Sequence, residues 1–213
     1  MRCIVGLLAI LAAFAGQAAS QGIVENVITQ VSSFFETYEE APYTIVKRTN
    51  TYEERSYPAR KWVCTENNAP LTEDVTENQF WKLFRYITGN NERSQSIAMT
   101  VPVSNQFTPA ATGDLAAYRM CFFIGQEHQA SPAQPSDSAV TIEEIPAMNI
   151  FTRTVGGYMD TDDNSRWMAE AATVRGFLDD MGESYDTSTM WWVGYDAPYK
   201  FWNRRNEVWY KKN

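Results

Sequence analysis

The sequence lacks most of the residues from which common metal and catalytic sites are built. Its 213 residues include one histidine, His128, and three cysteines. One histidine excludes a His-rich metal site and leaves little for a catalytic apparatus that needs a histidine base. The chain has no Gly-x-Ser-x-Gly, His-Glu-x-x-His or phosphate-binding loop, and Gly156-Gly157 is not a dinucleotide fingerprint. We therefore expect a protein that is not an enzyme.

Positive charge and long apolar runs are also scarce. The chain contains 18 Lys and Arg and 26 Asp and Glu, which gives a net charge of −8 and an isoelectric point near 4.8. Nucleic acids and anionic membranes bind basic surfaces, so we expect neither as a partner. Acidic clusters such as residues 160–163 do not have EF-hand spacing and are interpreted as solvated surface charge.

The N-terminal residues 1–20 have the arrangement of a secretory signal peptide. Arg2 provides the positive charge, an apolar stretch follows, and Ala18 and Ser20 occupy the small-residue positions of a cleavage site. We therefore expect a secreted, extracellular protein. Removal of this segment leaves Cys64 and Cys121, for which a disulfide and two buried free thiols are equally natural readings.

Aromatic residues are abundant. Seven Trp, eleven Tyr and eleven Phe make up 14% of the chain, which excludes disorder and supplies a core for one domain. Apolar residues recur at helical spacing in 21–42, which predicts an N-terminal amphipathic segment before a domain at 43–213. Runs rich in β-branched and aromatic residues predict the strands of that domain, at 43–48, 51–57, 60–65, 96–103, 116–125, 140–145, 148–155, 189–196 and 206–211.

Two helices are predicted between these strands. The first begins after Thr72 and ends at Gly89, and the second extends from about Asn164 to Met181. The apolar face of the second comprises Trp167, Ala171, Val174, Leu178 and Met181. The order strand–helix–strand–strand thus occurs twice, which favours an α+β fold with both helices on one β layer.

Four stretches of the chain resemble the SOUL haem-binding protein family. They are YEERSYPARKWV (52–63), FRYITGNNERSQSIAMTVPV (84–103), VGGYMD (155–160) and GYDAPYKFWNRRNEVWY (194–210). The resemblance covers about residues 43–213. It implies a duplicated βαββ module that forms a twisted antiparallel sheet or distorted β-barrel with two flanking helices, similar to the effector-binding domains of bacterial regulators.

The resemblance also implies a ligand, haem or another tetrapyrrole, held in a surface cleft lined by the first helix. Arg85 stands where family members commonly have a basic residue, Lys82 lies one turn earlier, and Lys200 follows GYDAPY. These cations are candidates to pair with the propionates, and Phe80, Phe84 and Met99 are candidates for the apolar wall. Solvated surface cations and ordinary core residues are the alternative readings of the two sets.

One departure from the family concerns iron. Some members have a histidine directly after the YE-x-R element, and this chain has Ser56 there. His128 lies in a polar loop and is a weak candidate for a metal ligand. The departure makes iron ligation doubtful and leaves tetrapyrrole binding intact. We expect a monomeric secreted carrier or scavenger of haem or porphyrin. The alternative is a protein-interaction module of the same fold that has lost haem binding.

Overall fold

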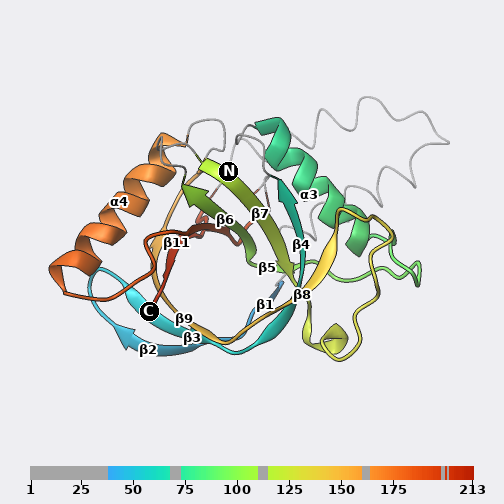
Figure 1. Cartoon of the computed structure of the whole chain (residues 1–213), viewed down its shortest axis with the longest axis horizontal. Helices are drawn as coiled ribbons and strands as arrows, with labels where there is room; N and C mark the ends of the chain where they lie inside the picture. Colours follow the sequence, from blue (N-terminus) through green and yellow to red (C-terminus); the bar gives the residue numbers. More distant parts are fainter. Residues whose placement is uncertain (1–37, 68–72, 110–114, 160–163, 198–199, 201) are drawn as a thin grey trace, which may run out of the picture. The chain divides into compact units, whose positions relative to one another are not determined.

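The computed structural model describes residues 38–67, 73–109, 115–159, 164–197, 200 and 202–213, and residues 38–213 form one compact unit. Its centre is a nine-stranded sheet in the order β2-β3-β9-β11-β10-β6-β7-β4-β8, in which every neighbouring pair is antiparallel. The sheet is strongly curled (Figure 1). Its strands are β2 (Thr44–Arg48), β3 (Glu53–Tyr57), β4 (Arg60–Asn67), β6 (Val103–Pro109), β7 (Leu115–Phe123), β8 (Thr141–Ile145), β9 (Met148–Val155), β10 (Met190–Gly194) and β11 (Asn206–Lys211).

Two helices pack on one face of this sheet. Helix α3 (Glu73–Ile87) lies on β4 and β7, and helix α4 (Ser165–Asp180) lies on β11 and β9 (Figure 1). Gly89 and Gly182 follow the helix ends with φ angles of +120° and +66°, a backbone region that glycine enters without a Cβ penalty. The units β4-α3-β6-β7 and β9-α4-β10-β11 confirm the predicted duplicated α+β arrangement.

The alternation of side chains along the strands produces two hydrophobic cores, one on each face. The helix-side core contains Leu83 of α3 and Leu178 of α4, and its other members include Phe107, Phe122, Phe151, Trp167, Trp192 and Val208. The opposite-face core includes Tyr57, Trp62, Cys64, Cys121, Ile150, Trp191, Val193 and Trp209. Because successive strand residues point to opposite faces, the adjacent Trp191 and Trp192 fall in different cores.

Three predictions of local structure are wrong. The single strand predicted at 96–103 is divided at Pro102, which lacks an N–H to donate, into β5 (Thr100–Val101) and the start of β6. Strand β5 pairs in parallel with β1 (Glu39–Glu40), so the end of the predicted amphipathic segment is a strand. Met181, predicted on the buried face of the second helix, caps α4 and is exposed. Residues 21–37 of that segment and the predicted signal peptide lie outside the described residues.

Candidate ligand-binding surface on helix α3

One flank of α3 carries three aromatic rings in mutual contact. Phe80 and Phe84, one turn apart, stack with ring centroids 5.9 Å apart, and Trp81 meets both rings edge-on. Phe80 also contacts Phe122 of β7, at a centroid distance of 5.4 Å, which attaches the group to the helix-side core. Phe80 and Phe84 are half-buried, whereas Trp81 is 44% exposed. We call Phe80, Trp81 and Phe84 the aromatic flank.

Met99 is the other predicted wall residue, and the structure places it against the same core as Phe80 and Phe84. It is half-buried and precedes β5. Its neighbour in the chain, Thr100, donates its hydroxyl to the carbonyl of Phe123 at 2.5 Å, which fixes this segment to the end of β7. Phe80, Phe84 and Met99 therefore pack against one common core.

Arg85 is the cation best placed to act with the aromatic flank. It follows Phe84 in the last turn of α3 and lies four residues after Trp81, so its side chain and the exposed indole share one side of the helix. Its side chain is exposed, and within the described part of the chain its guanidinium has no hydrogen-bond or ion-pair partner. Its five N–H donors are thus available to an incoming carboxylate.

Lys82 does not belong to the aromatic flank. It is two residues from both Phe80 and Phe84, a spacing that places side chains on different sides of a helix. Its ammonium donates to the side-chain oxygen of Gln79 at 3.0 Å, and Gln79 in turn accepts from the Thr65 hydroxyl at 3.2 Å. Gln79 is fully buried and was not singled out from the sequence, because one glutamine inside a helical pattern carries no signal of its own.

Lys200 lies at the same end of the sheet as the C-terminal half of α3. Phe122, near the end of β7, pairs with Val103 at the start of β6, and Val103 pairs with Gly194 at the end of β10. Gly194 in turn pairs with Asn206 at the start of β11, so the connection between β10 and β11 begins and ends at that edge. However, Lys200 forms an ion pair with Asp196, whose carboxylate also accepts from the backbone N–H of Arg205 at 2.5 Å. Asp196 and Lys200 lie in the connection between β10 and β11, outside any helix, so their i,i+4 spacing could not have predicted this pair.

Two positions bear on the question of an axial iron ligand, His128 and Ser56. His128 lies in the short helix η1 (Gln126–His128), with Nε2 2.8 Å from the Glu127 carboxylate. Ser56, at the position where relatives can have histidine, lines a separate open hollow of about 370 Å³ together with Lys211 and Lys212. Within the described ranges, no group of three or more His, Cys, Asp or Glu is arranged to hold a metal ion.

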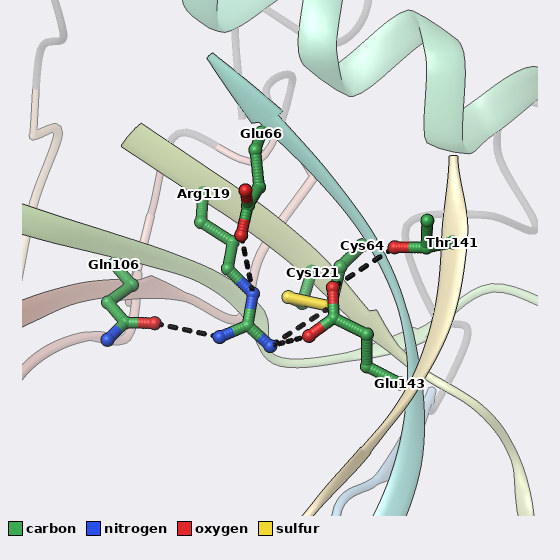
Figure 2. Close-up of a disulfide and its surroundings, with 7 residues drawn as sticks. All are labelled: Cys64, Glu66, Gln106, Arg119, Cys121, Thr141 and Glu143. Atoms are coloured by element: carbon green, nitrogen blue, oxygen red, sulfur yellow. Dashed lines mark hydrogen bonds and ion pairs between the residues drawn. A yellow bond between two sulfur atoms is a disulfide. The ribbon is translucent and has the colours of Figure 1, made fainter. Parts of the chain in front are cut away.

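Cys64 and Cys121 form a disulfide, which settles the question that the sequence left open. The two residues face each other directly in the β4–β7 pair and are buried. Figure 2 shows the guanidinium of Arg119 beside this bond, with Nη2 3.7 Å from the Cys64 sulfur. Arg119 also contacts Gln106 at 3.0 Å and Glu143, so the disulfide lies beneath a polar cluster on the face opposite the helices.

Comparison with known proteins identifies the family. The family model described as SOUL heme-binding protein matches residues 38–211. The chain belongs to the SOUL haem-binding protein family. It is 31% identical to heme-binding protein 1 of Mus musculus over 186 residues, which cover 85% of this chain and 96% of that protein. It is also 31% identical to heme-binding protein 2 of Homo sapiens over 170 residues, 79% of this chain and 82% of that protein. This membership supports tetrapyrrole binding.

Solved structures place this SOUL protein in a wider fold group. The C-terminal domain of EcmrR superposes with a TM-score of 0.52 at 11% identity, covering 80% of this chain and 98% of that domain. EcmrR in its complex with DNA gives a TM-score of 0.53 at 12% identity, covering 78% of this chain and 60% of that one. At this identity the likeness concerns the fold, and it agrees with the expected similarity to a regulator domain. None of the described helices is long and apolar enough to cross a membrane.

Proposed function

We propose that this SOUL protein is a secreted, non-enzymatic carrier or scavenger of haem and related porphyrins. The observation that supports it best is the aromatic flank of α3 next to the guanidinium of Arg85, which has no hydrogen-bond or ion-pair partner among the described residues. A porphyrin has two broad apolar faces and a carboxylate edge, and such a ligand suits apolar walls with one or two cations at the rim. Phe80, Trp81, Phe84 and Met99 would contact the ring, and Arg85 would pair with a propionate.

Lys200 is the second cation in this proposal, and Lys82 the third. A propionate that approaches Lys200 has to share its ammonium with Asp196, and one that approaches Lys82 meets a side chain directed to Gln79. We therefore expect Arg85 to contribute more to affinity than either lysine. Haem would be held mainly by its ring faces and propionates, because this chain has Ser56 where some family members have a histidine.

Secretion is supported by one feature besides the composition of residues 1–20. The disulfide between Cys64 and Cys121 is of a kind that persists in oxidising compartments and is rare in the cytosol of mesophiles. The test is expression of the full chain in animal cells, followed by N-terminal sequencing of protein from the medium. We expect a mature chain that begins at Gln21 and contains no free thiol. Retention in the cytosol would contradict this part of the proposal.

A titration tests ligand binding. Mature protein is mixed with hemin and, separately, with protoporphyrin IX, while Soret absorbance and Trp fluorescence are followed. We expect saturable binding of both ligands with similar affinities, since iron coordination contributes little. Arg85→Ala should weaken both about tenfold, which corresponds to about 1.4 kcal/mol for one exposed charge-assisted contact. Arg48→Ala, which removes another exposed arginine, on β2, is the matched control and should have no effect.

The carrier role has its own readout. Bound ligand should return unchanged in mass and spectrum after release, and hemin should pass to apomyoglobin faster than from a histidine-ligated protein. Saturable binding with chemical conversion of the ligand would indicate an enzyme instead. Absence of saturable binding of either ligand would contradict the proposal and favour the alternative of an interaction module.

A further inference from the structure

The Cys64–Cys121 disulfide joins the two strands on which α3 rests. In the β4–β7 pair, Cys64 lies opposite Cys121, and the adjacent residue pair is Val63 opposite Phe122. Because successive strand residues point to opposite faces, the cysteines belong to the opposite-face core, whereas Val63 and Phe122 face the helices. The Phe122 ring contacts the ring of Phe80, a member of the aromatic flank, at a centroid distance of 5.4 Å. The disulfide is therefore one residue away from the support of the proposed ligand site.

Both cysteines are buried, but the cover over their disulfide is polar and partly open to solvent. Arg119 places its Nη2 atom 3.7 Å from the Cys64 sulfur and forms an ion pair with Glu143 (Figure 2). The side chains of Arg119 and Glu143 are 24% and 32% exposed. Glu143 belongs to β8, which lies at the edge of the sheet beside β4. An edge segment opens locally at a lower free energy than a central strand, so a small thiol can reach the disulfide where this ion pair parts.

We propose that the Cys64–Cys121 disulfide is a redox switch for the ligand site on α3, reached by a reductant through the Arg119–Glu143 ion pair. The oxidised protein holds its tetrapyrrole, and reduction by a dithiol weakens binding at the aromatic flank. The proposal rests on the proposed function and adds the regulation of that site. It would let a carrier bind its ligand in an oxidising compartment and release it in a reducing one.

The effect of reduction on α3 follows from the packing around the sulfurs. Two sulfurs that are no longer bonded need more room than a disulfide, and a close-packed interior has little to spare. Trp62 and Phe123, two residues along each strand on the same face, close one end of the site with rings that meet at 5.5 Å. Strands β4 and β7 therefore have to shift, and Phe122 moves with its neighbour Cys121. The backbone ladder between the strands remains, so we expect a folded protein whose aromatic flank is less well ordered.

The reaction balances with one co-reactant, a dithiol. One of its thiolates attacks the Cys121 sulfur, a new S–S bond forms, and the bond to the Cys64 sulfur breaks. Cys64 leaves as a thiolate with the electron pair of that bond, and the adjacent positive charge of Arg119 makes it the better leaving group of the two. The second thiol of the reductant then attacks the mixed disulfide and releases Cys121. The two protons of the dithiol end on the cysteines, which gain two electrons, and the reductant is oxidised to a disulfide.

The first experiment measures ligand binding by the two redox forms. Protoporphyrin IX is the probe, because it has no iron that a thiol could bind or reduce. The mature protein is titrated with and without dithiothreitol, and circular dichroism records whether it is folded. We expect the reduced, folded protein to bind at least tenfold more weakly than the oxidised one. The double variant Cys64→Ala/Cys121→Ala should bind as weakly as the reduced protein, with and without dithiothreitol.

The second experiment follows the thiol chemistry. Glu143→Gln removes the ion pair over the disulfide and should speed its reduction by dithiothreitol at least fivefold. Glu144→Gln is the matched control, because this neighbour on β8 is exposed and points to the other face, and its rate of reduction should equal that of the wild type. Glutathione, a monothiol, gives a mixed disulfide that acid can trap. Trypsin cleaves after Lys61 and Arg119, so the two cysteines fall in separate peptides, and we expect glutathione on the peptide that contains Cys121.

The outcomes separate the switch from the proposed function. If the oxidised protein binds no porphyrin, the proposed function is contradicted and the switch with it. If both redox forms bind with equal affinity, or if glutathione is attached mainly to Cys64, the switch alone is overturned. Equal rates of reduction in Glu143→Gln and Glu144→Gln overturn it as well. Unfolding of both the reduced protein and the double variant also contradicts it, since a switch requires a folded state that has released its ligand.

Discussion

Glu207 is the residue whose replacement should show most clearly how the opposite face of the sheet is held together. It is fully buried on β11, and its carboxylate accepts two hydrogen bonds from Arg55, at 2.9 and 3.1 Å. It also accepts from the Arg205 guanidinium at 2.9 Å, the Tyr195 hydroxyl at 2.9 Å and the Trp209 indole at 2.7 Å. Replacement by glutamine keeps the size of the side chain but removes the charge, and it turns an NH₂ group toward donors.

The loss of stability in Glu207→Gln depends on which acidic partners Arg55 and Arg205 retain. Breaking a buried ion pair by removal of one partner costs about 3–5 kcal/mol. Arg55 retains Glu53 at 2.8 Å, and Arg205 retains Glu40 at 3.0 Å, so neither cation is left without an acid. We therefore expect Glu207→Gln to lower the free energy of unfolding by about 3 kcal/mol, at the lower end of that range.

The pH dependence provides a second measurement. Burial alone would raise the pKa of Glu207, but the charges of Arg55 and Arg205 outweigh it and hold the pKa below its ordinary value of 4.5. The stabilisation is then fully present above pH 4.5 and is lost as the pH falls through the depressed pKa of the folded state. The difference between wild type and Glu207→Gln should accordingly shrink as the pH is lowered below that value.

Urea unfolding followed by Trp fluorescence, at neutral and at acid pH, is the assay. Glu40→Gln is the matched control, because Glu40 pairs with the same Arg205 but is about one-third exposed, so its loss should cost less than about 1 kcal/mol. Equal effects of the two replacements would refute the reasoning. A difference between wild type and Glu207→Gln that grows on acidification would refute it as well.

Three further predictions concern stability. Reduction of the Cys64–Cys121 disulfide, which links positions 57 residues apart, should lower the free energy of unfolding by about 4 kcal/mol, measured by urea unfolding with and without reductant. Leu178→Ala at a fully buried position should cost about 2–5 kcal/mol by the same assay, and the exposed Met181→Ala should cost less than about 0.5 kcal/mol. Burial raises the pKa of Tyr86 from 10.0 to about 12, so stability should fall as the pH rises between these values, and less steeply in Tyr86→Phe.

Most of the helices and strands could be predicted because the spacing of apolar residues in this sequence matches the buried positions. Strands β9 and β11 were predicted with their observed bounds, and α4 to within one residue at each end. Pairing order could not be predicted, because strand alternation tells which face a residue occupies but not which strand lies beside it. Thus β9 lies between β3 and β11, and β10 joins the two halves of the sheet through β6.

The site residues stay a prediction, which ligand binding has to test. Phe80, Phe84 and Met99 pack against one core, which fits both an apolar ligand wall and the alternative reading of ordinary core residues. The sequence could not predict which of Lys82, Arg85 and Lys200 already has a partner within the protein. Lys82 is directed to the buried Gln79 because a helix of this register brings the two side chains together over Thr65. Such a contact depends on the depth at which α3 sits on β4, which no local pattern specifies.

The charged residues of the protein fall into two groups, and this division would let a strongly acidic chain hold the anionic ligand that we propose. On the opposite face, Arg55 and Arg205 are neutralised by Glu207 and by further acids, so they stabilise the sheet and offer nothing to a solute. On α3, Arg85 has no such partner within the described residues. Because a paired cation must give up an existing contact before it binds a propionate, an isolated arginine provides more affinity than its share of the total charge suggests.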